Sequence, residues 1–157
     1  MSGARSGSKM KVSTLEFSGS LLKRGFWLYF WEVRCGRKRF AYVGRTGDSS
    51  SVNAGSPFTR IGSHLNLKAN ARANTLVRQL RSAGLDPLVC SFKFVAFGPL
   101  YGESKTNHYP RRDRMAGLER SLADHLKDRG LKVLGSHGRI GGKLSADFRR
   151  AVDRALR

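Results

Sequence analysis

The segment from Phe26 to Val33, with the sequence FWLYFWEV, constrains the fold of this chain more than any other feature. Aromatic and β-branched residues crowd it, as is typical of β-strands. A second run of this kind, RFAYV from Arg39 to Val43, follows after a short polar stretch around Gly36. Two such runs separated by a turn predict a β-hairpin.

Downstream of the hairpin, the spacing of apolar residues alternates between helical and strand patterns. A polar, aperiodic stretch predicts an exposed loop over residues 45–57. Helices are predicted over residues 58–67, 70–83, 113–128 and 145–157, with a third strand over 88–97 that ends at Gly98-Pro99 and a long loop over 100–112. This order predicts an α/β (α+β) fold, with a small antiparallel three-stranded sheet flanked by helices.

The length of 157 residues and the hydrophobic content of 39% suit one compact domain. Residues 1–20 are expected to form a flexible basic arm, because they carry charge without a following apolar run, and residues 21–157 to form the domain. No segment approaches the length of a transmembrane helix, so we expect no membrane partner. Cys35 and Cys90 have neither metal nor redox spacing, and we expect reduced thiols and a cytoplasmic location.

The formal net charge of +19 comes from 30 basic and 11 acidic residues. Such a surplus attracts phosphate backbones through counterion release, and it makes nucleic acid the first partner to expect. Arginine is twice as frequent as lysine, and the guanidinium group binds phosphate in a bidentate way. A basic surface that is merely solvated, or an arginine-rich genome, is the alternative explanation.

Two segments beyond the third strand combine features of nucleic-acid contacts. The predicted loop over 100–112 carries aromatic residues together with Arg111 and Arg112, which would allow base stacking and phosphate contact. The last helix carries Arg149 and Arg150 on the face opposite its apolar residues. Chance aromatics in an exposed loop, and a helix that only seals the core, explain the same residues. The four histidines form neither a helix pair nor a Cys/His cluster, so nothing predicts a zinc site.

Each strand of the predicted hairpin carries a three-residue segment, or triplet, that contains one tyrosine. Trp27-Leu28-Tyr29 lies on the first strand and Tyr42-Val43-Gly44 on the second. Arg60 and His64 follow four residues apart on the next predicted helix, so they share one face of it. Glu119 lies beside the apolar stripe of the long helix, at the edge of the core.

This order of residues resembles the GIY-YIG nuclease superfamily. Its members carry Gly-Ile-Tyr on a first strand, Tyr-Ile-Gly on a second, an arginine and often a histidine on the next helix, and a metal-binding glutamate on a later helix, often followed by an asparagine. The resemblance covers roughly residues 26–134 and includes the order of elements. The chain departs from the family pattern in three places. Trp27 replaces the first glycine, and the loop before Arg60 is longer. The asparagine expected after Glu119 is missing, and Ser136 and His137 are the nearest polar candidates for its place.

The resemblance implies a metal-dependent endonuclease that hydrolyses phosphodiester bonds of DNA, with RNA not excluded. Glu119 would hold one Mg²⁺ or Mn²⁺ ion, Arg60 would stabilise the transition-state oxygens, and His64 would touch the same phosphate or water.

The same resemblance makes Tyr29 the general base, with Tyr42 beside it. A free phenol titrates near ~10, so Arg60, Arg45 and the metal would have to lower that pKa. Arg45, directly after the second triplet, would grip a flanking phosphate.

Each residue has a plainer explanation when taken alone. The tyrosines would be cross-strand aromatics, the Arg60 and His64 pair a solvated helix face, and Glu119 a partner of Arg120 or Lys127. Two other functions also fit the chain. One is a non-catalytic nucleic-acid-binding protein on a degenerate fold of this kind, and the other is an RNA-binding or ribosome-associated basic protein in which Glu119 has no role. A monomer and a homodimer both remain open.

Overall fold

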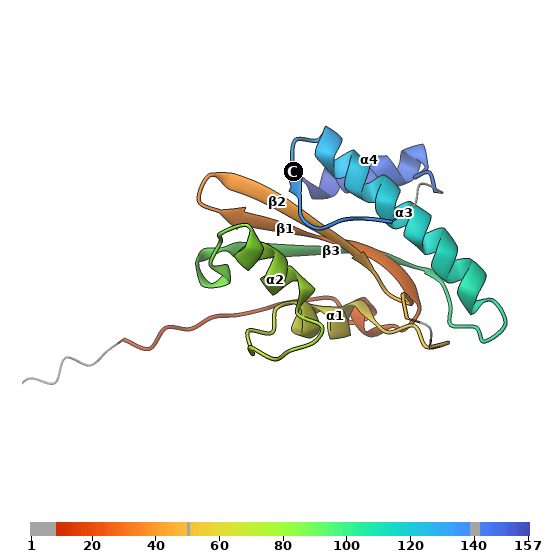
Figure 1. Ribbon diagram of the computed structural model, residues 1–157, viewed down its shortest axis with the longest axis horizontal. Helices are drawn as coiled ribbons and strands as arrows, with labels where there is room; N and C mark the ends of the chain where they lie inside the picture. The colour runs from red at the N-terminus through yellow and green to blue at the C-terminus, as the bar shows by residue number, and fades with distance from the viewer. Residues whose placement is uncertain (1–8, 50, 139–141) are drawn as a thin grey trace, which may run out of the picture.

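A computed structural model describes residues 9–49, 51–138 and 142–157 (Figure 1). Its regular elements, in chain order, are η1 (Gly19–Leu22), β1 (Phe26–Cys35), β2 (Lys38–Arg45), α1 (Pro57–His64), α2 (Thr75–Ser82), η2 (Pro87–Val89), β3 (Ser91–Tyr101), α3 (His108–Asp128), β4 (Lys132–Val133) and α4 (Ala146–Ala155). The predicted order of two strands, two helices, a strand and a helix is confirmed up to α3.

The sheet has four strands in the order β3-β1-β2-β4, so the prediction of three strands is wrong. The central strand β1 pairs antiparallel with β2 and β3. The additional strand, β4, is two residues long and runs parallel to β2 opposite Phe40 and Ala41. Two residues are too few to show an alternating pattern in the sequence, and only the turn after α3 brings this segment to the edge of β2.

The central strand is buried on both of its faces, because every residue from Phe26 to Val33 is buried. On one face, Leu28 and Phe30 pack with Met115 and Leu122 of α3 and with Val152 of α4. This packing accounts for the aromatic density of the segment, which has to fill two core layers at once.

On the opposite face of the sheet, Tyr29, Trp31 and Val33 pack with Leu76 and Leu80 of α2. Figure 1 shows α1 and α2 on this side of the sheet and α3 and α4 on the other. The fold is therefore three-layered, with one antiparallel hairpin at its centre.

Two boundaries differ from the sequence prediction in ways that affect the candidate site. Strand β3 continues through a cis Gly98-Pro99 peptide to Tyr101. Proline is tolerated there because β3 is an edge strand. Helix α3 begins at His108, which is fully buried and packs against Phe26 with ring centroids 5.4 Å apart. The side chain that packs the first turn of α3 into the core is therefore a histidine. A search for periodic apolar residues does not count histidine, so the helix was predicted to begin later, at residue 113.

Cys35 and Cys90 form a disulfide, so the expectation of reduced thiols is wrong. The register of β1 and β3 pairs Arg34 with Ser91, which places the next residue of β1 opposite the residue before β3. The two Cα atoms lie 4.6 Å apart, within the range of natural disulfides. Because disulfides persist mainly in oxidising compartments, the expected cytoplasmic location loses one of its supports.

Residues 9–18 of the predicted arm are exposed and carry no regular secondary structure. The arm contacts the rest of the chain at Phe17, whose ring lies 4.8 Å from that of Phe58. Across the described ranges, no helix is both long and apolar enough to cross a membrane.

Candidate active site

The candidate catalytic residues of the sequence analysis gather along one part of β2. Strand β4 pairs with β2 only at Phe40 and Ala41, so among the described strands the stretch from Tyr42 to Arg45 has a partner on the β1 side alone. Helix α1 lies on one side of this stretch and α3 on the other (Figure 1). The two tyrosines face α1, whereas Arg45 contacts α3.

The Tyr29 hydroxyl forms a 2.7 Å hydrogen bond with Nε2 of His64, the last residue of α1. Both side chains are buried, and only 1% of the Tyr29 surface is exposed. Gly44 lies opposite Tyr29 in the hairpin, and a Cβ atom added to it would stand 2.5 Å from the Tyr29 hydroxyl oxygen. The glycine of the second triplet is therefore required by the tyrosine of the first.

Tyr42 borders the same imidazole from the neighbouring position of the hairpin. Its ring lies edge-on to that of His64, with centroids 5.2 Å apart. Tyr42 is only half-buried, and its hydroxyl has a hydrogen bond with the Thr75 side chain at the start of α2. Of the two phenols, Tyr42 is the one that a molecule from solution reaches first.

Burial raises the pKa of the Tyr29 phenol well above its usual range, and the nearby Arg60 guanidinium opposes only part of that rise. Burial also raises the pKa of Tyr42, despite the opposing hydrogen bond from Thr75 and the charge of Arg60. Arg60 alone therefore does not hold the phenol pKa down, because desolvation outweighs its charge; the expected lowering by a bound metal stays a prediction.

His64 is neutral at pH 7. Burial lowers its pKa to about 4, and the positive charge of Arg60 acts in the same direction. Its Nδ1 atom is buried and has no hydrogen-bond partner in the part of the chain that the structure describes. The Tyr29–His64 pair thus joins a neutral phenol to a neutral imidazole.

Arg60 forms an ion pair with Asp48, which lies in the loop after β2. The charges of both residues act on Tyr29 and on His64, so the pair lies at the same site. Sequence reasoning missed Asp48, because a single aspartate in a polar loop carries no distinguishing pattern. Arg60 is the arginine expected to stabilise a phosphate. In the protein without a ligand, it is therefore bound by the Asp48 carboxylate.

Glu119 is paired with neither Arg120 nor Lys127. Its Oε2 atom accepts a 2.7 Å hydrogen bond from Nε of Arg45, whose Nη1 also donates to the Arg112 carbonyl oxygen at 3.2 Å. The Glu119 side chain is 20% exposed, and its charge contributes to the raised pKa of the two tyrosines. Glu119 therefore lies on the α3 side of β2, within electrostatic range of the two phenols.

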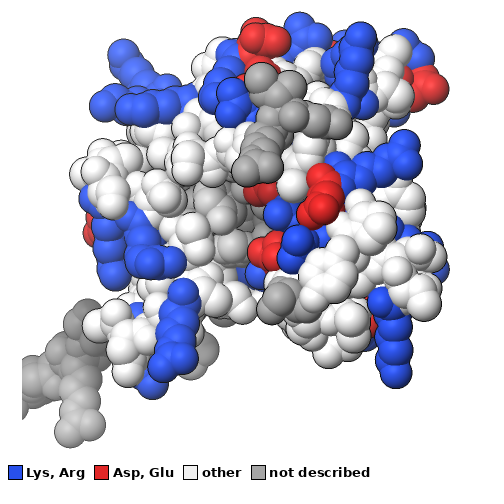
Figure 2. Space-filling model, turned by 45° about the vertical axis from the view of Figure 1, so that its right-hand side comes forward, with Lys and Arg blue, Asp and Glu red and all other residues white. Residues whose placement is uncertain are grey.

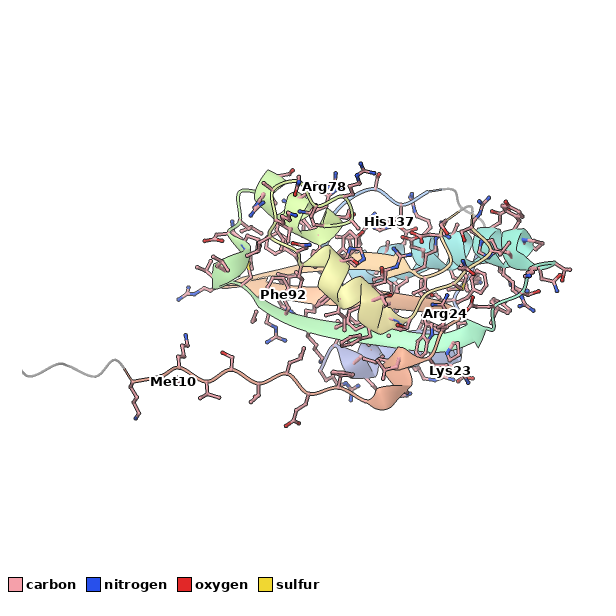
Figure 3. All side chains as sticks on the ribbon, turned by 90° about the horizontal axis from the view of Figure 1, so that it is seen from below. Met10, Lys23, Arg24, Arg78, Phe92 and His137 are labelled. Carbon is pink, nitrogen blue, oxygen red and sulfur yellow. A yellow bond between two sulfur atoms is a disulfide. The ribbon has the colours of Figure 1, made fainter. Side chains whose placement is uncertain are left out.

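His137, labelled in Figure 3, follows β4, and its imidazole lies near the Glu119 carboxylate. Its Nδ1 atom is 3.6 Å from Glu119 Oε1, and its side chain is only 5% exposed. Both ring nitrogens are buried, and no described residue forms a hydrogen bond with them. Sequence reasoning noted His137 only as a polar residue near a missing asparagine.

The remaining basic residues fall into two groups. Arg111 and Arg112 lie in the first turns of α3, and the main chain of Arg112 is bound by Arg45, so this group adjoins the site. Arg149 and Arg150 line a separate groove of about 500 Å³ between α3 and α4. Figure 2 shows a face on which Lys and Arg side chains outnumber Asp and Glu.

A metal ion at this site would depend on Glu119. The described residues contain no cluster of three or more His, Cys, Asp or Glu side chains that could hold an ion. One carboxylate with waters and a substrate phosphate is a usual arrangement for Mg²⁺, so a partly exposed Glu119 is compatible with such an ion.

Comparisons with protein-family models, with curated proteins and with solved structures give no match to this chain. The arrangement of the site therefore stands on its residues and their geometry.

Replacing Gly44 by alanine tests the contact between the two triplets. The added Cβ would collide with the Tyr29 hydroxyl, so we expect Gly44→Ala to lower the free energy of unfolding by about 1–3 kcal/mol, measured by urea denaturation. Gly62→Ala is the matched control, because a Cβ at this exposed helical position meets no atom within 4 Å. Equal stability of the two variants would contradict the contact.

The lowered pKa of His64 predicts a pH dependence of stability. A histidine whose pKa is lower in the folded state contributes stability above its unfolded pKa of 6.5, and loses it as the pH falls toward about 4. We expect wild-type protein to lose more thermal stability than His64→Gln between pH 7 and pH 4. Parallel curves for the two proteins would show that His64 is not buried as a neutral ring.

Proposed function

We propose that this chain is a metal-dependent endonuclease of the GIY-YIG kind that hydrolyses phosphodiester bonds of DNA. The observation that carries the proposal is the convergence of Tyr29, Tyr42, His64, Arg60 and Glu119 on one stretch of β2, from four separate elements. A solvated helix face or isolated core aromatics would not bring these five side chains within electrostatic reach of one another.

Hydrolysis of a phosphodiester needs positive charge near the phosphorus, an oriented water and a group that accepts the water proton. Arg60 supplies a guanidinium next to both phenols, and it is released from Asp48 when a phosphate competes for it. Glu119 would hold the divalent ion, which would neutralise charge on the phosphate oxygens. Arg45 orients the Glu119 carboxylate.

The proton acceptor is the Tyr29–His64 pair acting as one unit. A phenol with a raised pKa is not ionised at neutral pH, so Tyr29 alone is a poor base. As its oxygen takes a proton from water, its own proton passes to Nε2 of the neutral His64. Because Tyr29 is almost fully buried, the water and the phosphate approach over the more exposed Tyr42.

The DNA partner is supported by charge. The chain carries +19, and Arg111 and Arg112 adjoin the site through the Arg45 contact. Binding should weaken steeply with salt, as it does wherever lysines and arginines displace counterions from phosphates.

Cleavage of plasmid, single-stranded DNA, branched DNA and RNA, with Mg²⁺ or EDTA, tests the proposal. We expect Mg²⁺-dependent cutting of DNA that falls at least about 100-fold in Glu119→Gln and in Tyr29→Phe. Glu103→Gln is the matched control, because Glu103 forms a similar pair with Nε of Arg24, at 2.6 Å. It should cut at the wild-type rate.

Salt-sensitive binding without cutting on every substrate would instead support the non-catalytic binding protein. Tighter binding to RNA than to DNA, unaffected by Glu119→Gln, would support the RNA-binding alternative.

A further inference from the structure

The His137 imidazole lies near Glu119, and the proposed mechanism leaves its polar atoms unused. Its side chain is almost fully buried, and both of its nitrogens lack a hydrogen-bond partner among residues 9–49, 51–138 and 142–157. An unsatisfied buried polar group costs about 1–3 kcal/mol, so such a group calls for an explanation. The separation of 3.6 Å between its Nδ1 and Glu119 Oε1 is too long for a hydrogen bond.

A second histidine–carboxylate pair in the protein shows a different geometry. Nε2 of His125 lies 2.8 Å from Oδ1 of Asp153, at direct hydrogen-bond distance, and Arg129 binds both oxygens of the same carboxylate. That pair is closed, with no room for a third group between its members. The His137–Glu119 pair is open by comparison.

An open pair of this kind matches two ligands of one cation. Nitrogen and oxygen donors at about 2.1 Å from a metal lie about 3.0 Å apart at a right angle and about 3.4 Å apart at a tetrahedral angle. The observed 3.6 Å is close to this range. Arg45 binds Glu119 Oε2, which leaves Oε1 on the side of His137.

The loop that carries His137 is tied to the same helix as Glu119. Nη1 of Arg120 donates to the His137 carbonyl oxygen at 3.0 Å, and the Leu144 amide donates to Oγ of Ser121 at 3.2 Å. Gly142 packs so closely on α3 that an added Cβ would stand 2.5 Å from the Gly117 carbonyl carbon. The Arg120 contact holds the main chain of His137 against α3, at the residue that follows Glu119.

We propose that His137 Nδ1 and Glu119 Oε1 together ligate the divalent cation of this site. Imidazole nitrogen suits Co²⁺ and Zn²⁺, whereas Mg²⁺ prefers oxygen. The site then binds Co²⁺ more tightly than Mg²⁺, and His137 is the reason. The inference rests on the proposed function in taking Glu119 as the metal carboxylate.

Titration of the full chain with Co²⁺ and with Mg²⁺, without DNA, tests this inference by calorimetry and by the visible absorption of Co²⁺. We expect Glu119→Gln to weaken the binding of both ions. His137→Asn should weaken Co²⁺ binding at least about tenfold and alter the Co²⁺ spectrum, with little change for Mg²⁺. His125→Asn, in the closed pair, is the matched control and should bind both ions as wild type does.

The inference would be overturned if His137→Asn bound Co²⁺ with the affinity and spectrum of the wild type. It would also be overturned if His125→Asn lost as much Co²⁺ affinity as His137→Asn.

A measurement on the wild type covers the case in which a variant fails to fold. In the imidazole NMR spectrum, Co²⁺ should broaden or shift the His137 signals at lower concentration than those of His125, and the reverse order would also overturn the inference.

The two proposals fail separately. Co²⁺ binding that depends on His137 and Glu119, in a protein that cuts no nucleic acid, would sustain this inference and refute the nuclease. DNA cleavage with an unchanged preference for Co²⁺ over Mg²⁺ in His137→Asn would do the opposite.

Discussion

The register between β1 and β2 is the constraint on which the site depends. It sets Tyr29 opposite Gly44, and the absence of a side chain there makes room for the phenol to reach His64. A shift of one residue would turn Tyr29 to the other face of the sheet, among the residues that pack on α3. The burial of β1 on both faces fixes this register, because each face has its own set of aromatic and aliphatic partners.

The same hairpin connects two groups of charge on opposite sides of the sheet. Tyr42 and Gly44 face α1, where Arg60 pairs with Asp48, while the alternate residue Arg45 reaches Glu119 on α3. In the protein without a ligand, the charges of both arginines are therefore neutralised by carboxylates. Under the proposed function, a phosphate that enters between them would compete with Asp48 for Arg60 and meet Glu119 already oriented by Arg45.

The sequence predicted the hairpin and the order of elements up to α3, because aromatic strands and helical spacing are local patterns. The five residues chosen by resemblance lie in one region of the fold, and their roles stay predictions. It did not predict β4, the Cys35–Cys90 disulfide or Asp48, since each depends on chain segments that meet only in three dimensions. The raised pKa of Tyr29 was not predicted either, because it also depends on tertiary structure. Tyr29 is buried where α1 and α2 pack on the sheet, and this burial outweighs the charge of Arg60.

The claim that Tyr29 and His64 act as one unit is tested most directly by a double-mutant cycle on the rate of DNA cleavage. The rates of Tyr29→Phe, His64→Gln and the double variant would be compared with that of the wild type under single-turnover conditions. If the two residues share one proton transfer, the double variant should be no slower than the slower single variant. Effects that multiply would mean that the two residues act independently, and would contradict the account.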